Sequence, residues 1–242
     1  MQLNLLKDKE TLSKKATHDI TEIMSFKQNP LICVASGDSP SGIYKNIVNE
    51  VQKKNLNIDH WSFLGLDEWV GLNGADEGSC RWHLNRELFN PLNIKEASIC
   101  FFDGASKNLA QECLNTECYI QKHNGIEIAI LGLGMNGHIG MNEPQTPIST
   151  RSHVIDLDTI TIEVGQKYFN KPQPLTKGIT LGITTLLEAK HIILIVSGFK
   201  KAAIVKQVIE GPISELIPAS LLRNHPNCII YLDEAAASNL SM

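Results

Sequence analysis

The sequence lacks the cysteine patterns of disulfide-rich and zinc-binding proteins. Its six cysteines include no Cys-x-x-Cys pair, and three of them, Cys33, Cys100 and Cys228, lie in apolar runs typical of strands. Free thiols buried in a core are expected from this pattern, and they are compatible with a reducing compartment. We therefore expect a cytoplasmic protein without a metal site.

Long apolar runs and clusters of positive charge are also missing. No run approaches the ~20 apolar residues that span a bilayer, and residues 1–10 are polar and charged, unlike a signal peptide. The net charge is -4, and the 22 Lys and Arg residues are spread along the chain. These features argue against a membrane or a nucleic acid as partner, and they leave self-association into a homo-oligomer open.

Apolar and amphipathic segments alternate along the 242 residues, and no linker or repeat divides them. Strands are predicted at residues 31–35, 61–66, 98–102, 128–131, 153–157, 178–183, 191–196 and 228–232. Helices are predicted at residues 7–26, 43–53, 81–89, 107–123, 161–169, 184–189, 200–210 and 219–222. This alternation predicts one α/β domain over residues 1–242, with a largely parallel, open, Rossmann-like sheet covered by helices on both faces.

A polar, glycine-rich loop follows the most apolar of these strands. Residues 132–144 contain four glycines together with Asn136, His138 and Glu143. One interpretation is a flexible connection with a stray histidine. We favour a site, because open α/β sheets bind ligands beyond the carboxyl ends of their strands, and a carboxylate near a histidine fixes its tautomer and raises its basicity.

Two other segments offer groups that could hold an anion. Gly37 and Ser39 lie in a hydroxyl-rich turn between a strand and a helix, where backbone N–H groups and the helix dipole attract anions. Ordinary N-capping explains this turn equally well. Lys201 stands near the start of a later helix, where a cation is unfavourable unless it meets a ligand such as phosphate, although a solvated lysine is the commoner case.

Asp67 and Glu68 end another predicted strand, and their side chains should point to opposite faces, so only one can serve a site. An aspartate, a His–Glu pair and an anion cradle together predict proton transfer on a phosphorylated small molecule. Acyl transfer fits less well because no GxSxG motif is present. Residues 132–137 match GxGxxG in form, but His138 and the glycine and proline beyond it would interrupt the helix that a dinucleotide needs. No cofactor is expected.

Five segments resemble one family, the hexosamine-6-phosphate isomerase/deaminases, over nearly the whole chain. They are SGDSPSGIYK, LGLDEWVGL, LGLGMNGHIGMNEP, KGITLGITTLLEAKHIILIVSGFKKA and IPASLLRNHPN. The sugar-phosphate lactonases are similar but usually lack the NEP triplet, which therefore favours the isomerase/deaminase branch. The resemblance implies conversion of an amino-sugar 6-phosphate to a ketohexose 6-phosphate and ammonia.

The resemblance also implies roles for individual residues. His138 would assist opening of the sugar ring, and Asp67 would carry a proton between C2 and C1. Asn136 and Glu143 would orient His138. The substrate phosphate would be held by Gly37, Ser39, Lys201 and Lys167, the last standing where a common relative has arginine.

Two departures from the family pattern bear on the identity of the sugar, and a third bears on the binding of its phosphate. LDEW replaces LDEY, and DEGSC at residues 76–80 replaces a loop that commonly carries His-Pro and Ser-Tyr, which favours galactosamine 6-phosphate over glucosamine 6-phosphate. Asp38 lies in the phosphate loop, where an acid repels a dianion unless it points away. A lactone hydrolase and a non-catalytic sugar-phosphate-binding regulator are the alternative functions.

Overall fold

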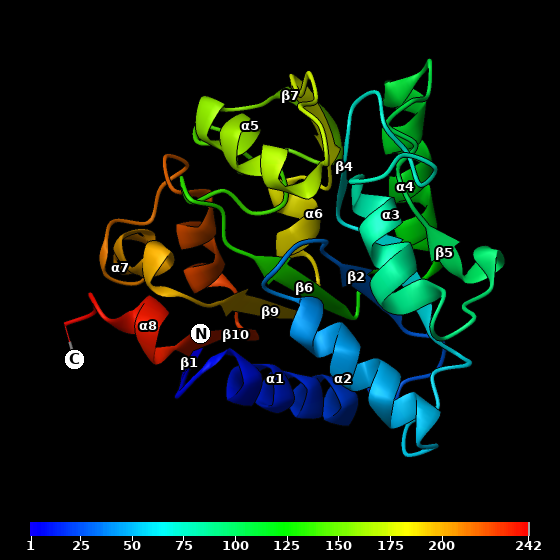
Figure 1. Ribbon diagram of the computed structural model, residues 1–242, viewed down its shortest axis with the longest axis horizontal. Helices are drawn as coiled ribbons and strands as arrows, with labels where there is room; N and C mark the ends of the chain where they lie inside the picture. Colours follow the sequence, from blue (N-terminus) through cyan, green and yellow to red (C-terminus); the bar gives the residue numbers. More distant parts are fainter. Residues whose placement is uncertain (242) are drawn as a thin grey trace.

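Two sheets form the frame of the protein in the computed structural model, which describes residues 1–241 (Figure 1). The larger sheet has seven strands in the order β1-β10-β9-β6-β2-β3-β5, and all neighbouring strands are parallel. The strands are β1 (Gln2–Leu6), β2 (Leu31–Val34), β3 (Ser62–Gly65), β5 (Ile99–Cys100), β6 (Ile128–Gly132), β9 (His191–Val196) and β10 (Cys228–Asp233). The predicted α/β class with a mostly parallel sheet is confirmed.

The order of the strands reverses between β2 and β6. From β2 the chain builds β3 and β5 on one side, and it then returns to place β6 on the other side. At such a reversal the loops that follow the two strands run in opposite directions and leave a crevice between them. The glycine-rich loop after β6 and the hydroxyl-rich turn after β2 therefore begin side by side.

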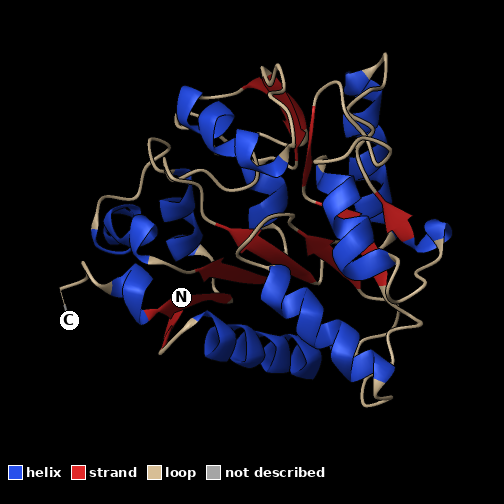
Figure 2. Ribbon diagram, in the orientation of Figure 1, coloured by secondary structure: helices blue, strands red, loops and turns tan. Residues whose placement is uncertain are grey.

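Helices lie on both sides of the large sheet (Figure 2). They are α1 (Lys9–Met24), α2 (Ser41–Gln52), α3 (Cys80–Leu84), α4 (Leu109–Lys122), α5 (Thr159–Gly165), α6 (Ile183–Leu187), α7 (Ala202–Glu210) and α8 (Glu234–Ala237). A π-helical turn, Asn85–Phe89, continues α3, and 3-10 turns cover Glu96–Ser98, Gln166–Tyr168, Phe199–Lys201 and Pro218–Asn224.

The core is split into two layers by the sheet. Successive residues of β2 alternate between them, since Ile32 packs with α1 and α2 whereas Leu31 and Cys33 pack with α4, α6 and α7. This is the burial on both faces that a continuous apolar strand predicts. Burial of these side chains stabilises the fold by roughly 1.5–3 kcal/mol for each large aliphatic residue.

A smaller antiparallel sheet was not expected from the sequence. It consists of β4 (Asp67–Trp69), β8 (Lys177–Thr180) and β7 (His153–Asp156), in the order β4-β8-β7. Figure 1 shows it grouped with α5 at the end of the molecule away from α1. Because β4 follows β3 after a single residue, Leu66, the small sheet receives its first strand directly from the large one.

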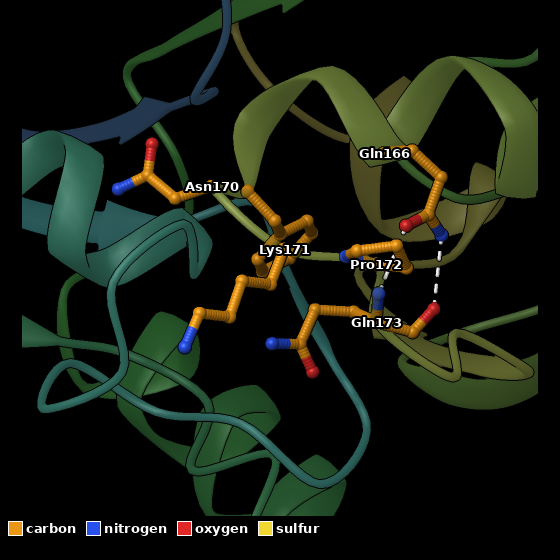
Figure 3. Close-up of a pocket in the computed structure, with 6 residues that line it drawn as sticks. Gln166, Asn170, Lys171, Pro172 and Gln173 are labelled. Carbon is orange, nitrogen blue, oxygen red and sulfur yellow. Dashed lines mark hydrogen bonds between the residues drawn. The ribbon is translucent and has the colours of Figure 1, made fainter.

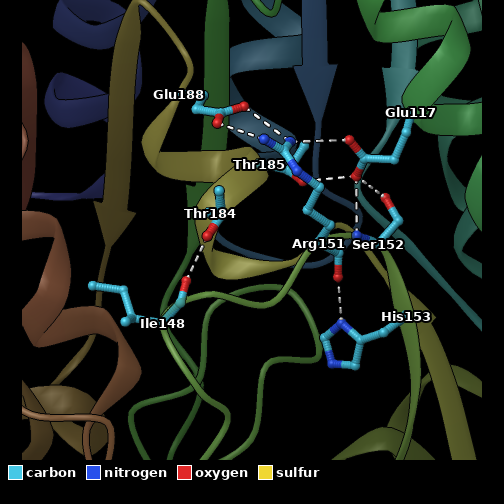
Figure 4. Close-up of polar contacts among 8 residues, drawn as sticks. All are labelled: Glu117, Ile148, Arg151, Ser152, His153, Thr184, Thr185 and Glu188. Atoms are coloured by element: carbon cyan, nitrogen blue, oxygen red, sulfur yellow. Dashed lines mark hydrogen bonds and ion pairs between the residues drawn. The ribbon is translucent and has the colours of Figure 1, made fainter.

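A polar network joins the small sheet to the helices beneath it (Figure 4). Arg151 donates two hydrogen bonds to Glu188, at 2.6 and 3.0 Å. Oε1 of Glu117 in α4 accepts hydrogen bonds from Ser152 N at 2.9 Å, from Ser152 Oγ at 2.6 Å and from Thr185 Oγ1 at 2.7 Å. These bonds tie the start of β7 to α4 and α6, so we assign the network an anchoring role.

Several element boundaries differ from the prediction. The helix predicted at 81–89 is α3 followed by the π-helical turn, and the helix predicted at 161–169 is α5 followed by a 3-10 turn. The edge strand β1 was missed because its residues are only partly buried and form no continuous buried run. Among residues 1–241, no helix is both long enough and apolar enough to span a bilayer.

Candidate active site

A cavity of about 630 Å³ lies at the carboxyl ends of β2, β6 and β9. The small sheet and α5 also contribute to its wall. Six of the residues singled out from the sequence line it: Gly37, Ser39, Asp67, His138, Lys167 and Lys201. Asn136 and Glu143 lie behind His138 and do not line the cavity. Residues far apart in the sequence thus meet at one place.

Asp67 is the first residue of β4, and its carboxyl group is almost entirely buried at the cavity wall. Burial raises the pKa of Asp67 to about 6, and a hydrogen bond from the Cys80 thiol and the neighbouring His138 oppose the rise. A carboxyl group with a pKa near 6 can both accept and return a proton close to neutral pH. The local environment therefore suits a general base.

Glu68 points to the other face of β4 and takes no part in the cavity. Its carboxylate accepts hydrogen bonds from the backbone N–H groups of Trp69, Cys80 and Arg81, each at 2.9 Å. Burial raises the pKa of Glu68 to about 7 despite these three bonds. Glu68 holds the start of α3 against β4, and the expectation that only one of the two acids faces the site is confirmed.

His138 is held from its Nδ1 side. Nδ1 lies 3.4 Å from Glu143 Oε2 and 3.1 Å from Thr161 Oγ1. Asn136 Nδ2 donates to the same Glu143 oxygen at 2.8 Å, and Asn136 Oδ1 accepts from the backbone N–H of His138 at 3.2 Å. Burial pushes the pKa of Glu143 upward, but the hydrogen bonds from His138, Thr161 and Asn136 hold it below its usual value. A carboxylate in contact with Nδ1 favours the proton there, so Nε2 is left to exchange protons with a ligand.

Thr161 contacts His138 although no sequence pattern singles it out. It lies near the start of α5, whose N-cap Asp158 accepts from the backbone N–H of Ile160 at 2.8 Å. Its hydroxyl reaches His138 from an element 23 residues later in the chain. No local pattern marks a threonine in the first turn of a helix as part of a site.

The glycines of the loop after β6 allow His138 to fold back over the chain. A Cβ atom at Gly134 would overlap the His138 imidazole ring, and the backbone N–H of Gly134 donates to the His138 carbonyl at 2.9 Å. Gly137 adopts a φ of 88°, in the left-handed region that glycine enters without strain. The loop is therefore a tight turn that presents the histidine.

The turn after β2 resembles an anion cradle more than a capped helix start. The first residues of α2 receive no side-chain cap, and Ser41 Oγ instead donates to the Asp38 carbonyl at 2.8 Å. Gly37 has a φ of 109°, and a Cβ atom there would lie 2.9 Å from Tyr168 Oη. The N-capping alternative is wrong, and the residues just before α2, from Ser36 to Pro40, line the cavity.

Two lysines approach this turn from different elements. Lys201 ends the 3-10 turn before α7, and its ammonium group donates to the Leu133 carbonyl. Burial and the nearby positive charge of Lys167 lower the pKa of Lys201 to about 8, although Asp38 opposes the shift. Lys167 forms an ion pair with Asp38, with 2.5 Å between Nζ and Oδ2. Lys201 is thus not a solvated lysine, and Asp38 does not point away from the cradle.

A second cavity, of about 380 Å³, lies among residues 166–173 (Figure 3). The Gln166 side chain donates to the Gln173 carbonyl and accepts from its backbone N–H, both at 2.9 Å. These bonds brace the loop, and none of the candidate catalytic residues lines this cavity. Within residues 1–241, no group of three or more His, Cys, Asp or Glu side chains could hold a metal ion.

The chain is similar to known proteins over nearly its full length. The sequence profile of the family described as glucosamine-6-phosphate isomerases/6-phosphogluconolactonase matches residues 7–230. The glucosamine-6-phosphate deaminase of Clostridium novyi is 36% identical over 241 residues, covering 99% of this chain and 100% of that protein. The enzyme of the same name from Clostridium perfringens is 37% identical over 243 residues, with 99% and 100% covered.

Solved structures show the same similarity in three dimensions. A monomeric glucosamine-6-phosphate deaminase superimposes with a TM-score of 0.95 at 32% identity, covering 99% of this chain and 100% of that one. The 6-phosphogluconolactonase from Trypanosoma brucei has a TM-score of 0.76 at 18% identity, with 99% and 98% covered, and it shares the fold. The full-length match to the profile and to relatives above 30% identity shows that the chain belongs to the glucosamine-6-phosphate isomerase/6-phosphogluconolactonase family.

Proposed function

We propose that this protein is an amino-sugar-6-phosphate isomerase/deaminase, which converts glucosamine 6-phosphate and water to a ketohexose 6-phosphate and ammonia. The observation that carries the proposal is that a buried carboxyl group, an oriented histidine and a phosphate cradle line one cavity. The choice of glucosamine 6-phosphate as substrate is supported by the relatives named above, which are called glucosamine-6-phosphate deaminases.

In this proposal Asp67 is the base. It removes the proton from C2 of the open-chain sugar, and an enolamine forms as a proton of the substrate ammonium group at C2 moves to the C1 carbonyl oxygen. The same carboxyl then returns the proton to C1, which leaves a protonated imine at C2. Water adds to this imine, and ammonia departs to leave a ketone. One carboxyl with a pKa of about 6 can serve both transfers because it is ionised at neutral pH yet basic enough to hold the proton.

His138 acts before this step by moving a proton between the hydroxyl at C1 and the ring oxygen. Its Nδ1 side is engaged by Glu143 and Thr161, so we assign the transfer to Nε2. Gly37, Ser39, Lys167 and Lys201 hold the phosphate at the other end of the sugar. A ligand fixed at both ends keeps C1 and C2 in reach of Asp67, and such positioning lowers the barrier.

Galactosamine 6-phosphate is the second candidate substrate. The two sugars differ only in the orientation of the C4 hydroxyl, and the loss of one hydrogen bond can decide between them. Trp69 of LDEW and Cys80 of DEGSC, which belong to two of the segments behind the sequence-based preference for galactosamine, both line the cavity. That preference stays a prediction, because the named relatives support glucosamine.

Lactone hydrolysis and binding without turnover have less support. The lactonase named above shares the fold at 18% identity, and the NEP triplet is present as residues 142–144. A binding protein would have no need for a buried, oriented acid–histidine arrangement. The function is therefore best described as catalysis on an amino sugar.

The test is ammonia release from glucosamine 6-phosphate and from galactosamine 6-phosphate, measured beside hydrolysis of 6-phosphogluconolactone. We expect ammonia from at least one hexosamine at a rate well above that of the Asp67→Asn variant. Lactone hydrolysis without ammonia from either sugar would overturn the proposal in favour of the lactonase. The ratio of kcat/KM for the two hexosamines decides the epimer.

A further inference from the structure

Asp38 stands at the centre of the phosphate cradle, between Gly37 and Ser39. Its carboxylate is paired with Lys167, a residue 129 positions later in the chain, at 2.5 Å. Both residues line the main cavity together with Lys201. The pair therefore occupies the place where a phosphate would meet the Lys167 ammonium.

The charges of the cradle cancel only in part. Lys167 and Lys201 supply two positive charges when protonated, and Asp38 removes one of them. The side chain of Asp38 is 70% exposed and that of Lys167 is 46% exposed, so water screens the pair and both groups are free to exchange partners. A phosphate dianion that enters this cradle must share or displace the Asp38 carboxylate.

We propose that Asp38 sets the affinity of the cradle for phosphate, because its carboxylate competes with the substrate phosphate for Lys167, a role that rests on the function proposed above. The competition lowers the affinity of the cradle for any phosphate. A sugar phosphate offsets the loss through contacts with the rest of the cavity, whereas inorganic phosphate has no such contacts. Asp38 thereby keeps the occupancy of the site by free phosphate low.

This role differs from an anchoring role for the same residue. If Asp38 only held Lys167 in place, its removal would loosen the lysine and weaken phosphate binding. If Asp38 competes, its removal frees the ammonium and strengthens phosphate binding. The two roles predict changes of opposite sign, so one titration distinguishes them.

The probe is inorganic phosphate, titrated calorimetrically at one fixed ionic strength into the full chain and its variants. Asp38→Asn keeps the size of the side chain and removes its charge. We expect its Kd for phosphate to fall about five- to tenfold, the size expected for one partly screened charge. Asp156→Asn is the matched control. Asp156 forms a similarly exposed ion pair with Lys177, with 2.8 Å between Oδ1 and Nζ, and neither residue lines the cavity. The Kd of this control variant should not change.

A double-variant cycle tests whether the effect passes through Lys167. In a Lys167→Met background, the gain from Asp38→Asn should shrink to less than twofold, because the contested ammonium is gone. An equal or weaker affinity in Asp38→Asn would overturn the proposal, and so would a gain of full size in the Lys167→Met background. The titration does not depend on turnover, so a failure to release ammonia from any hexosamine would count against the proposed function and not against this result.

Discussion

Nδ1 of His138 lies 3.4 Å from Oε2 of Glu143, and that same oxygen accepts a hydrogen bond from Asn136 at 2.8 Å. One carboxylate oxygen is therefore shared by the histidine and by the amide that also holds the histidine backbone. The arrangement fixes both the position and the tautomer of the ring. Loss of the carboxylate charge should consequently affect proton transfer more than substrate binding.

The Glu143→Gln variant should lower kcat about a hundredfold, in the range that general acid–base groups contribute. KM should change little, because Glu143 does not line the cavity. The measurement is steady-state ammonia release from the preferred hexosamine phosphate. Glu163→Gln, a change at the rim of the same cavity, serves as the control. A Glu143→Gln enzyme with wild-type kcat would refute the role given to this carboxylate.

Asp67→Asn should reduce turnover by a factor of about a thousand or more, since the amide cannot accept the C2 proton. Binding of the substrate should persist, because Asp67 is not among the cavity residues proposed to hold the phosphate. Ammonia release measures the first effect, and calorimetric titration with the sugar phosphate measures the second. Normal turnover in this variant would mean that another group is the base.

The same substitution should stabilise the fold at neutral pH. Burial raises the pKa of Asp67 from 3.8 to about 6, so the folded state holds the proton more tightly than the unfolded state. Ionisation then costs stability, with no cost below about pH 4, a growing cost up to pH 6 and a constant cost above it. Denaturant unfolding at pH 7.5 should show Asp67→Asn to be more stable by about 1–3 kcal/mol, and the gain should shrink as the pH falls toward 4. A destabilised variant at pH 7.5 would contradict the burial cost.

The pH dependence of kcat/KM should have two limbs. Below about pH 6 activity falls because Asp67 is protonated and cannot act as a base. Above about pH 8 it falls because Lys201 loses its proton and no longer attracts phosphate. Lys201→Arg should move the alkaline limb upward, since arginine stays charged at these pH values. An alkaline limb that does not move in this variant would assign it to another group.

Glu68→Ala should destabilise the protein more than any of the other changes. It leaves three backbone N–H groups, those of Cys80 and Arg81 at the start of α3 and that of Trp69 in β4, without their acceptor, at a cost of about 3 kcal/mol or more. Glu68→Gln keeps one acceptor oxygen and should lose less. Thermal unfolding of the two variants checks the order, and equal stability of Glu68→Ala and the wild type would contradict the assigned role.

The sequence predicted the parallel strands and the main site residues because both have local signals. The apolar run of β6 and the glycine-rich loop after it mark a strand and a turn wherever they occur. The small sheet has no such signal, since β4 is three residues long and its partner β8 lies more than a hundred residues away. The contacts of Thr161 with His138 and of Asp38 with Lys167 also join separate elements, 23 and 129 residues apart in the sequence. They depend on packing that a single sequence does not reveal.

The side chains of β4 point alternately to its two faces, so the position of a residue along the strand decides whether it meets the cavity. Asp67 faces the cavity and Glu68 faces the backbone of α3 because one residue, Leu66, separates β4 from β3. Changing that number by one would reverse the two faces. A deletion or insertion of one residue between β3 and β4 would turn each of the two carboxyl groups to the opposite face of β4, and it would disrupt the proposed base and the support of α3 together. The junction between the two sheets should therefore tolerate changes of residue type far better than any change of length.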